Sequence, residues 1–172
     1  MKLPPPLKLQ WVKKMRAKRA PKRVIAPDEV YRSRIVARLI NRVMRQGKKT
    51  VAQRHVYRAF DLVEEKTKEN SLKVFQTALE NVKPRMEVRP RRVGGASYQV
   101  PIPVRGDRRE SLAIRWLIQA AQARPNKEYH HFYEKLAAEL MDAANRQGGA
   151  VAKKEEVQKV AEANRAFAHF RW

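Results

Sequence analysis

Residues 85–105 read RMEVRPRRVGGASYQVPIPVR, which is two extended segments joined by Gly94-Gly95. Paired glycines adopt the positive-φ conformations that a tight hairpin turn requires. The first segment is rich in arginine, and the second is apolar at every second residue from Tyr98 to Val104. The arginines of the first segment are Arg89, Arg91 and Arg92. The pattern predicts a basic β-ribbon at about residues 86–104, a shape suited to contacting nucleic acid rather than to catalysis.

Two prolines in the second segment determine which of its edges can pair. Pro101 and Pro103 are two residues apart, so their missing N–H groups should lie along one edge of the strand. Val100 and Ile102 then donate toward the first segment, and the proline edge cannot recruit a third strand. An ordinary hairpin within a mixed sheet would need a further strand, and the rest of the chain reads as helix. We therefore expect a lone two-stranded ribbon.

Charge and composition indicate the kind of partner. The 172 residues include 39 Lys and Arg against 17 Asp and Glu, a formal net charge of +22. Such an excess favours a polyanion as partner, and 43% hydrophobic residues are enough for one folded domain at residues 27–172. Nucleic acid is favoured over a membrane surface. Binding to a membrane surface needs an exposed apolar helix face, and here the apolar faces of the helices are needed to form the core. No apolar run approaches the ~20 residues of a membrane span, so we expect no membrane partner.

The first 26 residues form a basic N-terminal arm. This arm contains no acidic residue, so self-repulsion should leave it disordered when free and ordered when it neutralises the phosphates of RNA. Trp11 could stack on a base or anchor the arm to the body. An organelle transit peptide is the alternative reading, disfavoured because Arg-Ser amphipathicity is missing. The candidate RNA-binding residues of the arm are Lys13, Lys14, Arg16, Lys18, Arg19, Lys22 and Arg23.

Apolar residues recur at helical spacing in six segments on either side of the ribbon. The first follows a predicted N-cap at Asp28 and ends at Gly47, the second covers about residues 50–68, and the third stops before Pro84. Beyond the ribbon we expect a fourth helix opened by a capping box of Asp107 and Glu110, a fifth ending at Gly148-Gly149, and a sixth at about residues 154–166. The predicted fold is mainly α: a six-helix bundle-like body with one protruding two-stranded β-ribbon and a basic arm.

Signals for catalysis are weak, and we expect neither an enzyme nor a cofactor. Gly47-Lys48-Lys49-Thr50 resembles the end of a phosphate-binding loop but lacks the second glycine and the preceding strand. His130 and His131 would point about 100° apart on a helix, which makes a poor metal chelate. The chain has no cysteine, and no serine lies in a nucleophile-elbow context.

Six motifs occur in an order that is similar to a known family. They are Gly47-Lys48-Lys49, the ALENVKP of residues 78–84, the RRVGG of residues 91–95, the YQVP of residues 98–101, the AIRW of residues 113–116 and the AEANRAFAHFRW of residues 161–172. Together they closely resemble the small-subunit ribosomal protein seven family, bacterial type. The resemblance covers about residues 27–172, which is the whole body.

This resemblance implies more than the residues show by themselves. Members of the family bind the 3′ major domain of small-subunit rRNA and start assembly of the subunit head. Their ribbon and C-terminal helix lie near the exit-site tRNA and the mRNA exit path, and small-subunit protein number eleven is a neighbour. By position, the implied rRNA surface includes Arg91, Arg92, Gly94, Gly95, Tyr98, Arg115, Lys48 and Lys49. The residues implied to lie near tRNA or mRNA are Gly94, Gly95, Ala96, His169, Arg171 and Trp172.

Charge extends the expected rRNA-binding set beyond these positions. The additional candidates are Arg32, Arg34, Arg38, Arg89, Arg105, Arg108, Arg109, Lys153 and Lys154. A solvated face remains the alternative for Lys153, Lys154 and the outer arginines of the first helix. Trp116 and Tyr129 are expected in the core rather than stacked on bases.

The sequence differs from the family pattern at two places, and two other functions remain possible. The family usually has an aliphatic residue where His55 stands, and the arm is longer than the family's usual start. The rivals are an architectural DNA-binding protein with an arginine ribbon and an RNA-modifying enzyme. We expect a cytoplasmic ribosomal protein, rather than one of an organelle ribosome, that does not form homo-oligomers.

Overall fold

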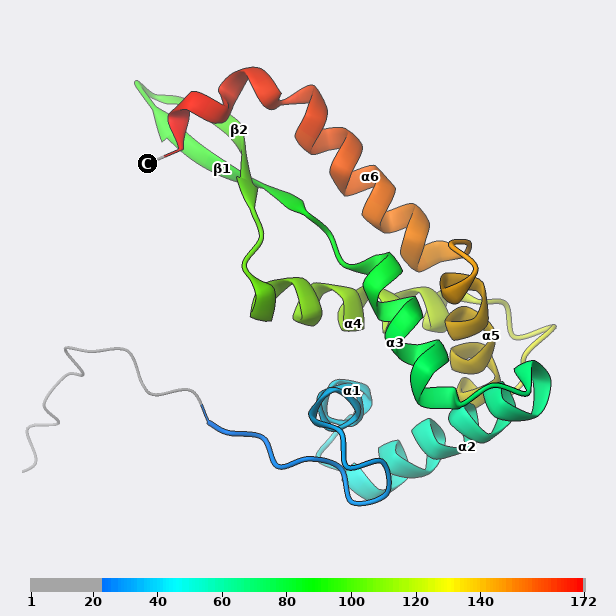
Figure 1. The fold of residues 1–172 in the computed structure, drawn as a ribbon. Coiled ribbons are helices and arrows are strands. Elements are labelled where there is room, and N and C mark those ends of the chain that lie inside the picture. Colours follow the sequence, from blue (N-terminus) through cyan, green and yellow to red (C-terminus); the bar gives the residue numbers. More distant parts are fainter. Residues whose placement is uncertain (1–22, 172) are drawn as a thin grey trace, which may run out of the picture.

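The computed structural model describes residues 23–171 (Figure 1). In chain order the elements are α1 (Arg34–Val43), α2 (Lys49–Thr67), α3 (Ser71–Val82), β1 (Met86–Val93), β2 (Ala96–Pro103), α4 (Gly106–Ala123), α5 (Phe132–Ala144), α6 (Gly149–Ala163) and the 3-10 helix η1 (Arg165–Phe170). This order confirms the predicted mainly helical fold with one two-stranded ribbon. The arm residues Lys13, Lys14, Arg16, Lys18, Arg19 and Lys22, the expected disorder of that arm, and Trp172 lie outside the described residues.

Helix α5 is the centre of the body because it packs against α2, α3 and α4. Residues 135–140 of α5 are all buried, and Ala137, Ala138 and Ala143 allow its neighbours to approach closely. The helices around it contribute Phe60, Phe75 and Leu117, each less than 2% exposed. Phe60 and Phe75 contact each other with ring centroids 5.5 Å apart. The core is therefore built from the apolar stripes that the helical spacing predicted.

The hairpin pairs β1 with β2 in antiparallel register from Met86 opposite Pro103 to Val93 opposite Ala96. Gly94 and Gly95 have φ values of +56° and +91°, the left-handed conformations expected of this turn. Just beyond the register, the Val104 N–H donates to the Arg85 carbonyl at 3.1 Å. Because hydrogen-bonded pairs alternate along an antiparallel ladder, this bond places the nitrogens of Pro101 and Pro103 on the outer edge.

A proline also prevents a further strand from pairing with the opposite edge of the ribbon, which is the outer edge of β1. Pro90 lies opposite Gln99, which is also a non-hydrogen-bonded pair, so its nitrogen faces away from β2. The described residues contain only this two-stranded sheet. Both edges of the ribbon therefore carry proline, and the predicted lone ribbon is confirmed.

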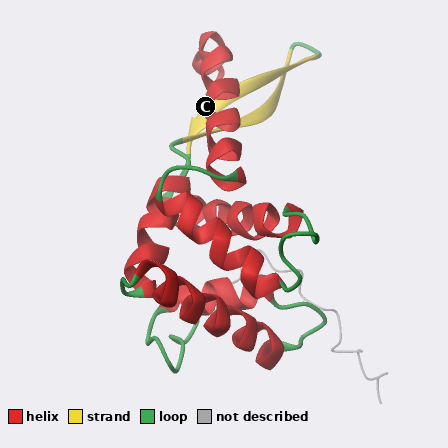
Figure 2. Ribbon diagram, turned by 90° about the vertical axis from the view of Figure 1, so that its right-hand side faces the viewer, coloured by secondary structure: helices red, strands yellow, loops and turns green. Residues whose placement is uncertain are grey.

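The ribbon projects from the helical body together with α6 (Figures 1 and 2). Helix α6 packs along β1, and η1 packs on β2. The end of the described chain thus returns to the ribbon (Figure 1). The two projecting parts support one another although residues 104–148 separate them in the chain.

Two predicted helix ends in the first part of the chain are wrong. Helix α1 begins at Arg34 after Ser33, not after Asp28. Asp28 is buried, and its carboxylate accepts the Tyr31 N–H at 3.2 Å and the Tyr57 hydroxyl at 2.8 Å. The Asp28 side chain, which the sequence pattern assigned to a helix N-cap, is therefore bound by Tyr57 of α2 instead. The same helix ends at Val43, before Gly47, which forms the turn into α2 with φ +73°.

Three further predictions fail beyond the ribbon. Asp107 and Glu110 form no capping box, because Arg105 is the N-cap residue of α4 and Glu110 pairs instead with Arg38. Helix α5 ends at Ala144, and Gly148-Gly149 begin α6 instead of terminating α5. Helix α6 therefore covers Gly149–Ala163 rather than about residues 154–166. The alanines after Gly149 and the charged run of residues 153–156 leave too few large apolar residues to show where this helix begins.

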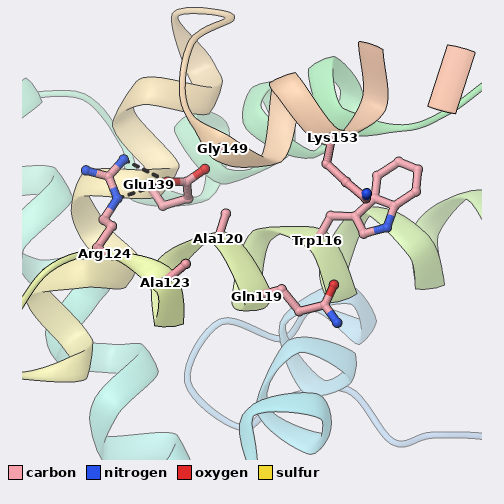
Figure 3. A pocket seen from close by; sticks show the side chains of 8 residues that line it. All are labelled: Trp116, Gln119, Ala120, Ala123, Arg124, Glu139, Gly149 and Lys153. Atoms are coloured by element: carbon pink, nitrogen blue, oxygen red, sulfur yellow. Dashed lines mark hydrogen bonds and ion pairs between the residues drawn. The ribbon is translucent and has the colours of Figure 1, made fainter. Parts of the chain in front are cut away.

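A buried ion-pair network fixes where α6 leaves the body (Figure 3). Glu139 is 1% exposed, and its Oε2 accepts hydrogen bonds from Arg124 Nε at 2.9 Å and Nη2 at 2.7 Å. Its Oε1 accepts the Ala150 N–H at 2.9 Å, which satisfies one of the free donors in the first turn of α6. Arg124 also pairs with Asp142, and its guanidinium lies 5.6 Å from the Tyr129 ring centroid.

The close approach in this network requires Gly148. Its φ is +90°, and a Cβ there would lie 3.0 Å from Glu139 Oε1 and 3.2 Å from Asp142 Cβ. Burial by itself would lower the pKa of Arg124, but its hydrogen bonds to Asp142 and Glu139 raise that pKa above the ordinary value. Arg124 therefore remains charged, and the end of α4, the middle of α5 and the start of α6 are joined by one set of polar contacts.

We predict that Arg124→Met lowers the free energy of unfolding by about 3 kcal/mol, because it leaves the buried Glu139 carboxylate without its charge partner. Urea unfolding followed by circular dichroism measures this loss. The control is Lys153→Met on α6, which removes an exposed pair with Glu156 and should change stability by less than about 0.5 kcal/mol. Equal small losses in both variants would contradict a structural role for the network.

The Asp28–Tyr57 hydrogen bond generates a pH prediction. Burial, reinforced by the bond to Asp28, raises the pKa of Tyr57 from 10.0 to about 12. The folded chain holds this proton more tightly than the unfolded chain does, so stability present below pH 10 should fall as the pH rises through about 12. Tyr57→Phe should make this decline shallower in urea unfolding over that range. The matched control, Tyr98→Phe, should keep the steep decline because the Tyr98 ring packs on Phe167 and Phe170 rather than on a carboxylate.

Candidate nucleic-acid interface

The base of the ribbon is held by ion pairs, whereas its tip is open. Glu87 is 8% exposed and accepts from Arg89 Nη2 at 2.6 Å and from Arg108 Nε at 3.2 Å. These two predicted RNA-binding arginines therefore neutralise a buried carboxylate. Toward the tip Arg91 and Arg92 are exposed, and a Cβ built on Gly94 or Gly95 would meet nothing within 4 Å. A partner can approach the backbone of the turn closely.

Tyr98, an expected rRNA contact, lies in an aromatic cluster with the C-terminal segment. Its ring centroid lies 5.2 Å from that of Phe167 and 5.2 Å from that of Phe170. Since these contacts occupy Tyr98, its ring attaches η1 to β2. His169 lies in η1 and Arg171 directly follows it, so the packing of η1 on β2 holds both near the ribbon. Both residues are exposed, as is Ala96 at the start of β2. The structure thus brings together the described residues expected near tRNA or mRNA.

A second cationic region lies between α1, α4 and the segment that precedes α1. A groove of about 450 Å³ there is lined in part by Arg23, Arg38 and Arg42. Arg38 is held by Glu110 within this region. Arg42 was absent from the predicted set, although it follows Arg38 by one helical turn and this spacing could have identified it. The groove brings the predicted Arg23 and Arg38 together.

The other predicted cations have different surroundings. Arg32, Arg34, Arg105, Lys48 and Lys49 are exposed. Arg109 Nε donates to the Pro84 carbonyl at 3.1 Å and Lys154 Nζ to the Asn81 carbonyl at 2.8 Å, so both brace the chain near the ribbon. Lys153 pairs with Glu156 on the exposed side of α6. Arg115 is half-buried, and its Nε is buried without a hydrogen-bond partner in the described chain.

Sequence reasoning missed two hollows in the surface. One lies between α4 and α6, with Arg124 and Glu139 at one end and Trp116 at the other (Figure 3). Trp116 is 8% exposed, in agreement with its expected place in the core. The other hollow lies beside the loop between α1 and α2 and includes Lys48, His55 and Phe132 among its lining residues. Both are formed by residues far apart in the sequence, which no local motif could have revealed.

Within residues 23–171, no three His, Asp or Glu side chains lie together as a metal ion would require. Among the helices of the same residues, none is both long enough and apolar enough to cross a bilayer.

A helical body with a braced basic ribbon and exposed cations is typical of structural proteins that bind nucleic acid. The family model for ribosomal protein S7p/S5e matches residues 15–165, which is most of the chain. The chain belongs to the ribosomal protein S7p/S5e family.

Curated relatives agree with this assignment. The chain is 60% identical over 151 residues to small ribosomal subunit protein uS7 of Caldicellulosiruptor saccharolyticus, an alignment that covers 88% of this chain and 95% of the relative. It is 58% identical over 158 residues to the protein of the same name from Thermotoga maritima, with 92% and 100% covered. The chain is 57% identical over 152 residues to the protein of the same name from Carboxydothermus hydrogenoformans, an alignment that covers 88% of this chain and 96% of the relative. As a bacterial-type member, this is a structural, non-enzymatic protein of the cytoplasmic ribosome.

We predict that Tyr98→Ala releases η1 from the ribbon. Loss of two aromatic contacts should raise amide hydrogen exchange in residues 165–170 by about tenfold, since each pair contributes about 0.5–1.5 kcal/mol. Hydrogen exchange with mass spectrometry measures the change. Gln99→Ala is the control, because Gln99 is exposed on the same strand. Unchanged exchange in η1 would show that Tyr98 does not hold it.

Proposed function

We propose that this protein is a primary binder of the 3′ major domain of small-subunit rRNA and that its binding begins assembly of the subunit head. The resemblance of the ribbon and C-terminal motifs to the ribosomal protein seven family supports this role. The observation that carries the proposal is the braced ribbon, with exposed Arg91 and Arg92 beside an open glycine turn. Because α6 and η1 already hold the ribbon, little conformational entropy is lost when RNA binds.

Affinity and specificity come from different features in this proposal. With a net charge of +22, phosphate contacts from the ribbon and from the exposed cations of α1 and its following loop supply affinity. The exposed candidates there include Arg34, Lys48 and Lys49. Specificity comes from the folded shape of the rRNA and from its unpaired bases, which a rigid ribbon can recognise. Binding would hold the helices of an rRNA junction in one arrangement so that later proteins can add.

The ribbon end of the molecule is the proposed neighbour of the exit-site tRNA and the mRNA exit path. Gly94, Gly95, Ala96, His169 and Arg171 are exposed there, and η1 is held on β2 through Tyr98. Trp172 is part of the same proposal on the basis of the resemblance. Small-subunit protein number eleven is the proposed neighbouring protein, and the chain is proposed to act without forming homo-oligomers.

The proposal predicts that Arg91→Gln combined with Arg92→Gln weakens binding to an rRNA 3′ major-domain fragment by about tenfold at 0.1 M salt. The slope of log affinity against log salt should decrease by about 1–2, roughly one unit for each phosphate that the variant no longer neutralises. Filter binding from about 50 to 200 mM salt measures both quantities. The control removes the same charge with Lys66→Gln and Lys68→Gln, at the end of α2 distant from the ribbon (Figure 1).

Two results would contradict the proposal. Equal weakening by the ribbon and control variants would mean that total charge, not the ribbon, determines affinity. Equal affinity of the unmodified protein for the rRNA fragment and for random duplex DNA at the upper salt concentration would favour the architectural DNA-binding rival.

A further inference from the structure

The ring of His55 connects α2 to the first turn of α5. It meets Phe132 edge to face, with centroids 6.0 Å apart and an interplanar angle of 83°, and it stacks on Tyr133 at 6.2 Å. Tyr133 in turn stacks on His131, whose ring centroid is 5.2 Å away. These rings form one continuous cluster that holds the end of the α4–α5 connection against α2.

One nitrogen of the His55 ring is buried without a partner. Nδ1 is inaccessible to water, and within residues 23–171 no group forms a hydrogen bond with it. A neutral imidazole tolerates this position, because one of its nitrogens carries a lone pair instead of a proton. A protonated imidazole carries a proton on both nitrogens, so Nδ1 would become an unpaired buried donor on a charged group. Protonation therefore costs free energy for as long as the ring stays in the cluster.

The surroundings of His55 also disfavour a positive charge. Within residues 23–171, the ionisable residues that repel a charge on this ring or line the hollow beside it are all basic. The start of α5 adds its free backbone N–H groups, which carry partial positive charge. The basic residues are Arg54 and Arg58 of α2, Arg45 and Lys48 of the α1–α2 loop, His130 and His131 of the α4–α5 connection, and Lys135 of α5.

Acidic residues of the same elements do not line this hollow. Glu128 lies in the connection and is exposed, and Glu134 Oε2 accepts the His131 N–H at 3.1 Å at the start of α5. The acidic residues of α2 begin only at Asp61. Burial, followed by repulsion from Arg58, accordingly lowers the pKa of His55 below its usual value of 6.5.

This direction gives the sign of the pH effect. The folded chain releases the His55 proton more readily than the unfolded chain does. The stability contributed by the neutral contact is therefore complete above pH 6.5 and declines as the pH falls below 6.5 toward the lowered pKa.

We infer that His55 is a pH-sensitive switch between α2 and the start of α5. The neutral ring holds Phe132 and Tyr133 against α2. The protonated ring leaves the cluster for the hollow of about 470 Å³ beside it, where water can solvate both N–H groups. Residues 130–133 then lose their contact with α2. An aliphatic residue, which the family usually has at this position, would fill the space without responding to pH.

The opening stays local because the earlier part of the connection is held by other contacts. Lys135 Nζ donates to Asn126 Oδ1 at 2.6 Å, and the Arg124 guanidinium lies 5.6 Å from the Tyr129 ring centroid. Neither contact includes His55. The inference concerns the fold and does not depend on which molecule the protein binds.

The test is an NMR titration of the full-length, isotope-labelled protein from about pH 7.5 to about pH 5, where histidine changes its charge. Nuclear Overhauser effects from the His55 ring to the Phe132 and Tyr133 rings should fall by at least about threefold as His55 titrates. Those between Phe60 and Phe75, whose centroids lie 5.5 Å apart in the core, should not change.

Variants identify the titrating group. His55→Leu keeps an apolar contact with Phe132 and should abolish the pH response, and His55→Met provides a second uncharged side chain if the first variant disturbs packing. The matched control, His131→Gln, removes the other histidine of the cluster and should leave the response in place.

Four results would overturn the inference. The first is persistence of the His55 effects after the ring is protonated, and the second is a His55 pKa at or above 6.5. The third is a pH response that both His55 variants retain or that His131→Gln abolishes. The fourth is simultaneous loss of the Phe60–Phe75 effects, which would indicate global acid unfolding. None of these results bears on the rRNA affinity of the ribbon variant.

Discussion

The carboxylate of Glu139 is the contact on which the arrangement of this protein depends. It is buried in the central helix α5, pairs with Arg124 at the end of α4, and accepts an N–H from the first turn of α6. The Glu139 side chain therefore links α4, α5 and α6 and fixes how these three helices lie relative to one another. Because α6 then runs along β1 and continues into η1 on β2, the direction of the ribbon follows from this contact. A ribbon without such support would be only marginally stable, since two strands alone bury little surface.

Acidic residues separate the supporting cations from those available to a partner. Glu87 engages Arg89 and Arg108 at the base of the ribbon, and Glu110 engages Arg38 between α1 and α4. These pairs use part of the limited supply of 17 acidic residues, and many of the other cations, among them Arg34, Arg92 and Lys48, are exposed. A protein with this distribution folds through a few buried pairs and is attracted to a polyanion through the rest. The proline-bearing edges of the ribbon also keep its backbone from recruiting another strand.

Local patterns were sufficient where the cause of the structure is local. The turn at Gly94-Gly95 and the apolar stripes of the helices agree with the prediction, because backbone conformation and helical period are read directly from neighbouring residues. The predictions failed at Asp28 and Glu110, whose side chains are used by Tyr57 and Arg38. Arg38 and Glu110 are 72 positions apart, so no spacing rule could connect them. The packing of Tyr98 on Phe167 and Phe170 was not foreseen for the same reason.

The sequence by itself therefore determined the helical class, the ribbon with its unpaired edges, and the excess of positive charge that favours nucleic acid. Each of these follows from residue type and short-range spacing. Only the tertiary structure decided which cations are held by acids, where α6 begins, and that His55 and Phe132 meet beside Lys48. These features depend on side chains that are distant along the chain and become neighbours only after the helices pack. Their positions are set by the core and by the Glu139 contact, which local sequence patterns do not contain.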